Sequence, residues 1–357
     1  MTPFYLIILF SLIAAVVEYV SDKPSRLALY TLSFVLIIFA GTREIGIDPD
    51  SDNYQRIFDN YSEVNFFDGG LTNILYEPLS KAIFFLTSRF GFNIETVFLF
   101  YAVTSIGLKG MLIRKISPLP MLSMYLFCCH FFLYYEMVQI RAALAMGIAL
   151  FACLISWQKP YWSLGILLLA STIHVSAILG IAFYIFKEFS IGLKKYFAVL
   201  LGCLVIALIF LVLPSLFLEL LAFLPLAKAE DYLEIINSFE PASIYGITMI
   251  HLAPALLGLW LIDRNIITDG FEIRAIQFYS MCIPYYLIFL PISVMAYRSS
   301  EFFQFAGVIV IPILLKRLTW GPVLFVLLLI AGIGVSYFTL HVRELFPIGY
   351  ISWIGIF

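Results

Sequence analysis

Long apolar runs separated by short polar connections recur along this chain of 357 residues. A membrane-spanning helix needs about 20 mostly apolar residues, so runs of this length can cross a bilayer. The composition agrees, because 62% of the residues are hydrophobic and only 12% are charged, which is more apolar surface than one soluble core can bury. The pattern predicts an all-α, polytopic integral membrane protein with about 12 transmembrane helices. The expected segments are 4–21, 27–41, 76–90, 94–113, 119–135, 139–156, 161–186, 196–217, 244–262, 275–294, 301–316 and 320–340.

Basic residues cluster in several of the short connections, and this predicts the side of the membrane on which each connection lies. Clusters such as Arg114 with Lys115 are expected to face the cytoplasm. Both chain ends and two long loops, at about 42–76 and 218–243, then face the outside. The first loop contains seven acidic residues and two basic ones, as expected on the far side. No linker interrupts the series, so we expect residues 1–357 to form a single transmembrane domain.

Two segments do not fit a simple series of crossings. Residues 76–90 are short and begin and end on the same side, which indicates a re-entrant or half helix. Residues 161–186 are flanked by Lys159 and Lys187, so both ends are expected inside. We interpret this run as two short helices that meet near His174. Irregular backbone at membrane depth must be buried in protein or line a water-filled cavity, so a cavity near His174 is expected.

Three arginines lie beside or within apolar runs, where a permanent charge is expensive. They are Arg43, Arg141 and Arg298, and the predicted topology places all three at outer helix ends together with His174. The planar guanidinium donates in pairs to phosphate oxygens. A lipid-linked phosphate or diphosphate is therefore the expected ligand. The alternative for each arginine is that it extends to the membrane interface, and His174 is either a proton acceptor, a hydrogen-bond donor to phosphate, or part of the packed core.

The acidic run Asp48-Pro49-Asp50-Ser51-Asp52 resembles a cluster of divalent-metal ligands. It lacks the glycine and the terminal glutamate of a calcium loop, and an acidic surface loop is the commoner explanation. We therefore expect no metal site and no cofactor. Gly46 and Pro49 favour a turn that would hold Asp48 and Tyr54 near Arg43, and an Arg43–Asp48 ion pair is the structural alternative to a catalytic role for Asp48.

Several short motifs, in this order, resemble the EpsG/Wzy family of polysaccharide polymerases, and they span nearly the whole chain. They are residues 41–48 (GTREIGID) followed by Asn53-Tyr54, residues 139–145 (QIRAALA), residues 173–177 (IHVSA), Tyr297-Arg298 with Phe302-Phe303, and an ending at 346–350 (FPIGY) that is similar to the family's Pro-Tyr. The loop between Gly46 and Tyr54 is longer than the family's usual spacing. This leaves open whether Asp48, Asp50 or Asp52 occupies the family's acidic position.

The resemblance implies a glycosyltransferase with a GT-C-like architecture in the bacterial inner membrane. Such an enzyme joins repeat units of O-antigen, capsule or exopolysaccharide at the periplasmic face. Donor and acceptor glycans would both be carried on undecaprenyl diphosphate, and the partners would be these lipids, the bilayer and a chain-length regulator protein. Nucleic acid is not an expected partner.

On this interpretation the arginines stabilise the charge that develops on the leaving diphosphate. Arg141 and Arg298 would hold diphosphate oxygens, and Arg43 would order its loop or contact a second diphosphate. The base that deprotonates the attacking hydroxyl would be His174 or a carboxylate. The candidate carboxylates are Asp48, Asp52 and Glu136.

Glu136 has an alternative role as the ion-pair partner of Arg141, five residues further on. Tyrosines near the outer ends usually anchor helices at the interface, but their rings can also stack on sugars. Tyr54, Tyr135 and Tyr297 are the expected glycan-binding residues.

Three other classes of function compete with a polymerase. A flippase or transporter of lipid-linked oligosaccharide would line a path through both leaflets with cations rather than cluster them on one side. A ligase that transfers a finished glycan would share the chemistry, and only the family resemblance separates it from a polymerase. A noncatalytic scaffold would not explain Arg141.

Overall fold

The computed structural model describes residues 2–63, 77–186, 192–213, 216, 241–347 and 349–352. Within these residues the regular elements are helices. The β-structure is limited to one isolated antiparallel bridge, between Arg43 and Ser352. The expected all-α class is therefore confirmed. The helices form two compact units, which are described separately. Unit 1 comprises Met1–Ile148, Leu169–His174 and Ile311–Phe357, and unit 2 comprises Ala149–Leu168 and Val175–Val310.

Unit 1 contains the N-terminal helices and the last long helix, and three helices (α7, α8 and α17) are shared between the units along the chain. Its elements are α1 (Thr2–Ser21), α2 (Arg26–Gly41), α3 (Ser51–Glu63), α4 (Pro78–Arg89), α5 (Ile94–Ile116), α6 (Pro120–Leu126), the π-helix η2 (Phe127–Glu136), α7 (Ile140–Ile155), α18 (Gly321–Tyr337) and the π-helix η6 (Phe338–Val342). The remaining elements are α8 (Pro160–Ile173), the 3-10 helix η3 (Val175–Ile178), α9 (Leu179–Phe186), α10 (Leu193–Val212), the 3-10 helix η5 (Ile247–His251), α13 (Leu252–Asp263), α14 (Gly270–Ser280), α15 (Cys282–Ile288), α16 (Ser293–Gln304) and α17 (Gly307–Leu315).

Four helices in the described part of the chain are long and apolar enough to cross a membrane. They are α1, α5, α10 and the continuous run of α18 with η6, Gly321–Val342. The pair α16 and α17 would be a fifth span, bent by 53° at the break between them. The protein is therefore a membrane protein. The count of about 12 spans and the single-domain organisation stay predictions.

The two irregular segments have the local structure expected of them. Helix α8 ends at Ile173, and His174 separates it from η3 and α9, which confirms the break near His174. Helix α4 has 12 residues, and at 1.5 Å per residue it is about 18 Å long, too short to cross a bilayer of about 30 Å. Whether α4 re-enters the membrane stays a prediction.

Two segments expected to be continuous spans are broken, and a third changes its helix type. The run 119–135 continues from α6 directly into the π-helix η2, whereas 275–294 divides at Met281 into α14 and α15. Pro284 lacks the N–H that would bond the carbonyl of Ser280, which ends the regular ladder there. The run 301–316 is divided between α16 and α17, where Gly307 lies against the Tyr279 ring, and a Cβ at Gly307 would be 2.9 Å from that ring.

Helix α3 lies inside the segment 42–76, which was expected to be only a loop. Its buried apolar residues are Tyr54, Ile57, Phe58 and Tyr61, at the spacing of one helical face. Charged residues occupy the other face, so the helix is too polar to be recognised from hydropathy. Residues 64–76 of this loop, and residues 218–240 of the loop expected at 218–243, lie outside the described part of the chain.

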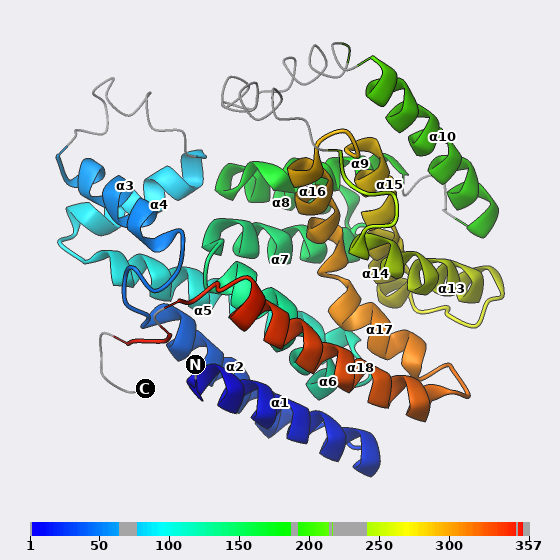
Figure 1. The fold of residues 1–357 in the computed structure, drawn as a ribbon, viewed down its shortest axis with the longest axis horizontal. Coiled ribbons are helices and arrows are strands. Elements are labelled where there is room, and N and C mark those ends of the chain that lie inside the picture. Colours follow the sequence, from blue (N-terminus) through cyan, green and yellow to red (C-terminus); the bar gives the residue numbers. More distant parts are fainter. Residues whose placement is uncertain are drawn as a thin grey trace. The chain divides into compact units, whose positions relative to one another are not determined.

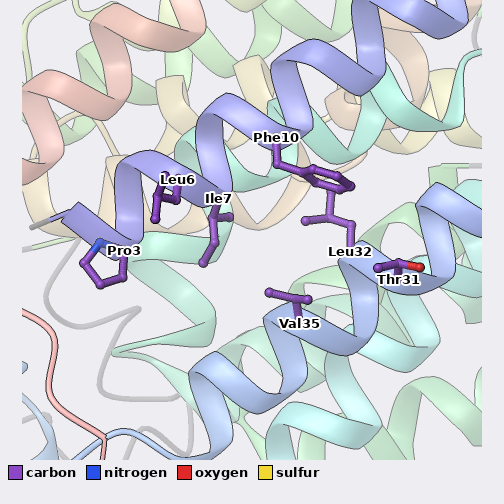
Figure 2. Close-up of a pocket in the computed structure, with 7 residues that line it drawn as sticks. All are labelled: Pro3, Leu6, Ile7, Phe10, Thr31, Leu32 and Val35. Atoms are coloured by element: carbon purple, nitrogen blue, oxygen red, sulfur yellow. The ribbon is translucent and has the colours of Figure 1, made fainter. Parts of the chain in front are cut away.

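In unit 1, α2 packs along α5 and α1 packs against α6 (Figure 1). A mainly apolar groove of about 200 Å³ lies between α1 and α2 (Figure 2). Its lining residues are Pro3, Leu6, Ile7 and Phe10 from α1 and Thr31, Leu32 and Val35 from α2. The groove offers no charged group to a ligand, so the polar chemistry of unit 1 lies elsewhere.

The end of α2 approaches α5 so closely that only glycine fits. A Cβ at Gly41 would lie 2.6 Å from Leu99 Cδ1 and 2.9 Å from Leu99 Cα. We expect Gly41→Ala to destabilise the protein by about 1–3 kcal/mol through overpacking, measured as a lower unfolding temperature in detergent. Gly107→Ala on α5 is the matched control, because nothing lies within 4 Å of a Cβ there, and it should leave stability unchanged or slightly raised. Equal stability of the two variants would contradict the tight packing.

Candidate functional site

Arg43 is the second residue after α2, behind the C-cap Thr42, and is completely buried, with 0% exposure. Its Nε donates to Asp48 Oδ2 at 3.1 Å and its Nη1 donates to the carbonyl of Ala40 at 2.6 Å. Its Cζ lies 4.0 Å from the centroid of the Phe98 ring. The Arg43–Asp48 ion pair, which the sequence offered as the structural alternative to a catalytic Asp48, is therefore present and fully shielded from solvent.

Asp48 also organises the loop that follows Arg43. Its Oδ1 accepts hydrogen bonds from the backbone N–H groups of Asp50 and Ser51, at 3.1 and 3.0 Å. Ser51 is the first residue of α3, so the carboxylate caps this helix. The Ser51 hydroxyl accepts a bond from the N–H of Gly46 at 2.9 Å, where the backbone has a positive φ of 85° that favours glycine. Both carboxylate oxygens of Asp48 thus hold the loop and the start of α3.

The C-terminal segment packs against the end of α2. Glu44 N–H donates to the carbonyl of Ile351 at 3.0 Å, beside the bridge between Arg43 and Ser352. The Tyr350 hydroxyl donates to the carbonyl of Phe39 at 2.8 Å, and the two rings stack with centroids 3.7 Å apart. Burial raises the pKa of the Tyr350 hydroxyl, which keeps it protonated as a donor.

We expect Tyr350→Phe to weaken this packing by about 1 kcal/mol, the typical contribution of one hydrogen bond. The readout is the unfolding temperature in detergent. Tyr337→Phe is the matched control, since Tyr337 is 58% exposed, and it should change stability by less than about 0.5 kcal/mol. A Tyr350→Phe protein as stable as the wild type would show that ring stacking alone holds the segment.

Two aromatic rings connect Arg43 with Arg141. Phe98, which stacks on Arg43, lies 6.2 Å from the Tyr54 ring, centroid to centroid. Arg141 Cζ lies 5.9 Å from the centroid of the same Tyr54 ring. Tyr54 is buried and projects from α3, whose start Asp48 fixes. The structure therefore brings Arg43, Asp48, Tyr54 and Arg141 together in unit 1, as the sequence predicted for the first three.

Arg141 lies in the first turn of α7 and forms an ion pair with Glu77, which is the residue before α4. The side chains are 16% and 17% exposed. The pair is therefore accessible, whereas the Arg43–Asp48 pair is not. Among the cations of unit 1 that the sequence singled out, Arg141 is the one that an outside ligand can reach.

His174 lies next to the same short helix. Ser80, one turn after Glu77 on α4, donates from its hydroxyl to the carbonyl of Ile173 at 2.8 Å. The Ser80 hydroxyl also bonds the Tyr101 hydroxyl on α5 at 2.9 Å. The backbone that leads into His174 is thus fixed against the helix that begins at Glu77. The His174 side chain is partly exposed.

The alternative role of Glu136 as the ion-pair partner of Arg141 is wrong. Glu136 pairs instead with Lys109 on α5, and Arg141 pairs with Glu77. The reason is the π-helix η2, whose wider turns direct Glu136 into the interior, where it is 2% exposed, while Arg141 begins the next helix. A carboxylate shielded to this degree makes no contact with an outside ligand.

Arg298 and Tyr297 belong to α16 in unit 2. Arg298 is exposed and has no ion-pair partner among the described residues. The Tyr297 ring packs against Tyr286, with centroids 5.5 Å apart, and the Tyr286 hydroxyl donates to the carbonyl of Ser243 at 2.7 Å. Tyr297 thus packs in a cluster with Tyr286, and the next residue, Arg298, is exposed.

The remaining expected site residues differ in exposure. Asp52 is exposed in the first turn of α3. Tyr135 is 2% exposed and stacks on Phe131 within η2. In the described ranges, no group of three or more His, Cys, Asp or Glu residues is placed to hold a metal ion.

Three residues of the site were not anticipated from the sequence. Glu77 lies at the start of the expected segment 76–90 and Phe98 lies within the expected span 94–113, and neither was assigned a role from the sequence. Lys109 gave a usable signal, because it is a lone charge within an apolar run of α5, and such charges in membrane helices are usually paired or functional.

The fold and the site define an all-helical membrane protein with buried and half-buried arginines at helix ends. The EpsG family model matches residues 26–352, and the chain belongs to the EpsG family. It is similar to the amylovoran biosynthesis protein AmsC of Erwinia amylovora, with 26% identity over 208 residues. That match covers 56% of this chain and 54% of AmsC, so it spans about half of the relative. No solved structure matches the chain.

Proposed function

We propose that this protein is a membrane glycosyltransferase that polymerises oligosaccharide repeat units into a surface polysaccharide. Donor and acceptor are carried on undecaprenyl diphosphate, and the reaction takes place at the periplasmic face of the bacterial inner membrane. Support comes from membership of the EpsG family and from the similarity to AmsC, whose name places it in amylovoran biosynthesis. O-antigen and exopolysaccharide are both within this class of product.

The observation that carries the proposal is the accessible Arg141–Glu77 pair, whose guanidinium carbon lies 5.9 Å from the centroid of the Tyr54 ring. Glu77 neutralises the guanidinium when no ligand is bound. A diphosphate carries more negative charge than one carboxylate and offers several acceptor oxygens to the guanidinium fork. We infer that the diphosphate displaces Glu77 and that Arg141 then stabilises the charge on the leaving group.

In the proposed reaction the acceptor hydroxyl oxygen attacks the anomeric carbon of the donor sugar. The bond between that carbon and the diphosphate oxygen breaks, and the diphosphate leaves with the electron pair. The hydroxyl proton passes to His174, whose backbone is fixed beside α4. Asp48 and Glu136 are less suited to this step, because their carboxylates already hold buried partners.

The other residues take supporting roles in this proposal. Arg43 orders the loop before α3 through Asp48. The exposed Arg298 contacts the diphosphate of the second substrate, and Tyr297 beside it contacts the glycan. Tyr54 and Tyr135 are buried, so direct stacking of a sugar on either ring requires a side-chain movement, and Tyr54 is better placed to support Arg141.

The test is deletion of the gene in its own host, followed by analysis of the lipid-linked and surface glycans. A polymerase deletion leaves single repeat units on the outer face, and complementation with the wild-type gene restores long chains. Accumulation of repeat units on the cytoplasmic face would identify a transporter instead. Long chains that remain on the lipid carrier would identify a ligase, and either result would overturn the proposal.

A further inference from the structure

Besides the buried Arg43–Asp48 pair and the accessible Arg141–Glu77 pair, a further ion pair lies deep inside unit 1. Lys109 of α5 pairs with Glu136, the last residue of η2, and the two side chains are 1% and 2% exposed. The Ser105 hydroxyl, one turn before Lys109, donates to Glu136 Oε1 at 3.0 Å, and Lys109 Nζ donates to Ser105 Oγ at 3.0 Å. Lys109 Nζ also lies 5.7 Å from the centroid of the Phe127 ring.

A gain in folding stability alone does not explain this cluster of Ser105, Lys109 and Glu136. Removing two charges from water is expensive, and an apolar pair of similar volume is often equally stable or more stable. Charged residues inside membrane segments are rare and are commonly functional. Since the cluster is closed to solvent, its function must be carried out through the elements that it joins.

The cluster joins α5 to η2, and η2 is followed by α7, which carries Arg141. Backbone bonds from Met137 N–H to Phe132 O (3.2 Å) and from Gln139 N–H to Tyr134 O (3.3 Å) continue the wide turns of the π-helix beyond Glu136. Helix α7 begins at Ile140, so the junction between Glu136 and Arg141 is only four residues long. π-Helical turns are rare, and where they interrupt α-helices they are often found at functional sites.

Lys109 also contacts the body of α7. A Cβ added at Gly147 would lie 3.4 Å from Lys109 Cε, so the lysine stem packs on α7 where glycine permits close approach. Gly147 is six residues after Arg141, about 9 Å along the helix. One lysine side chain therefore fixes α7 at two points, through Glu136 before its start and through Gly147 within it.

We propose that Ser105, Lys109 and Glu136 form a positioning cluster that fixes the N-terminus of α7 and thereby the Arg141–Glu77 pair. The consequence for substrate binding rests on the proposed function, in which Arg141 holds the diphosphate. Glu136 is then a positioning residue and not the base. The cluster fixes the orientation of the Glu136 side chain as well as its position, because one Glu136 oxygen accepts hydrogen bonds from both Lys109 and Ser105.

The test uses the full-length protein purified in detergent. Lys109→Met leaves Glu136 buried without its partner, and this single variant is expected to fold poorly. The double variant Lys109→Met/Glu136→Met removes both charges and keeps the interior filled, so it should fold with an unfolding temperature close to the wild type. Lys115→Met is the matched control, since it removes an exposed lysine from the same helix.

Two measurements are made on each variant. The first is hydrogen exchange of the backbone amides of residues 137–143, which is expected to be about tenfold faster in the double variant and unchanged in Lys115→Met. The second is binding of farnesyl diphosphate, a short isoprenoid diphosphate, whose Kd is expected to rise about tenfold. In an Arg141→Ala background the double substitution should have no further effect on binding, because the cluster acts through Arg141.

The outcomes separate the two proposals. Unchanged exchange at residues 137–143 in the folded double variant would overturn the positioning role, whatever the binding result. An additive loss of binding in the Arg141→Ala background would also overturn it. A third outcome is faster exchange in the double variant together with normal binding of farnesyl diphosphate by Arg141→Ala. This result would support the cluster as the element that fixes α7, and it would refute the proposed role of Arg141.

Discussion

Replacement of Arg141 with alanine is expected to reduce polymerisation at least about 100-fold, with the protein still present in the membrane. The reason is that, of the two unit 1 arginines singled out from the sequence, Arg43 is fully buried whereas Arg141 is partly exposed and paired with Glu77. Removal of one preorganised group that stabilises a developing negative charge typically reduces kcat by 10²–10³. The measurement is the length distribution of surface glycans in the deletion host complemented with the variant.

Arg141→Lys tests whether charge alone is sufficient. Lysine keeps the charge but loses the planar fork, so we expect partial activity with a raised KM. Arg56→Ala is the matched control, since Arg56 is an exposed arginine of α3 whose side chain donates only a 3.4 Å bond to Asn53. Normal glycan ladders from a well-expressed Arg141→Ala protein would refute the assignment.

The broad fold and part of the site were predictable from the sequence, because each rests on a local signal. Apolar runs predict helices without reference to tertiary structure, and the break at His174 follows from the basic residues on both sides of 161–186. The Arg43–Asp48 pair was predictable because the turn at Gly46 and Pro49 brings the two residues together within six positions. In each case the interacting groups are close in sequence.

The predictions that were wrong concern contacts between residues that are far apart in the sequence, which sequence spacing does not reveal. Glu136 and Arg141 are five residues apart, which suggested a pair, but the π-helix η2 directs Glu136 toward Lys109, 27 positions earlier in the chain. Arg141 instead pairs with Glu77, 64 positions away. Hydropathy also missed α3, because its apolar face packs on protein while its other face is charged, so its mean hydropathy is that of a polar loop.

Replacement of Asp48 with alanine is expected to destabilise the protein by about 3–5 kcal/mol, because it leaves the fully buried Arg43 without its counter-charge. Loss of the cap of α3 adds about 1 kcal/mol. The expected readouts are less folded protein in the membrane and a clearly lower unfolding temperature in detergent. Asp52→Asn is the matched control, since Asp52 is an exposed carboxylate four residues later, and it should change stability by less than about 0.5 kcal/mol.

A second substitution separates a structural role of Asp48 from a catalytic one. Arg43→Leu/Asp48→Ala removes the unpaired charge and should recover part of the lost stability, because deletion of both partners is less costly than deletion of one. If Asp48 mainly fixes the loop, activity should follow the amount of folded protein across the single and double variants. An Asp48→Ala protein that is as stable as the wild type but inactive would instead make Asp48 the base, and His174 would lose that role.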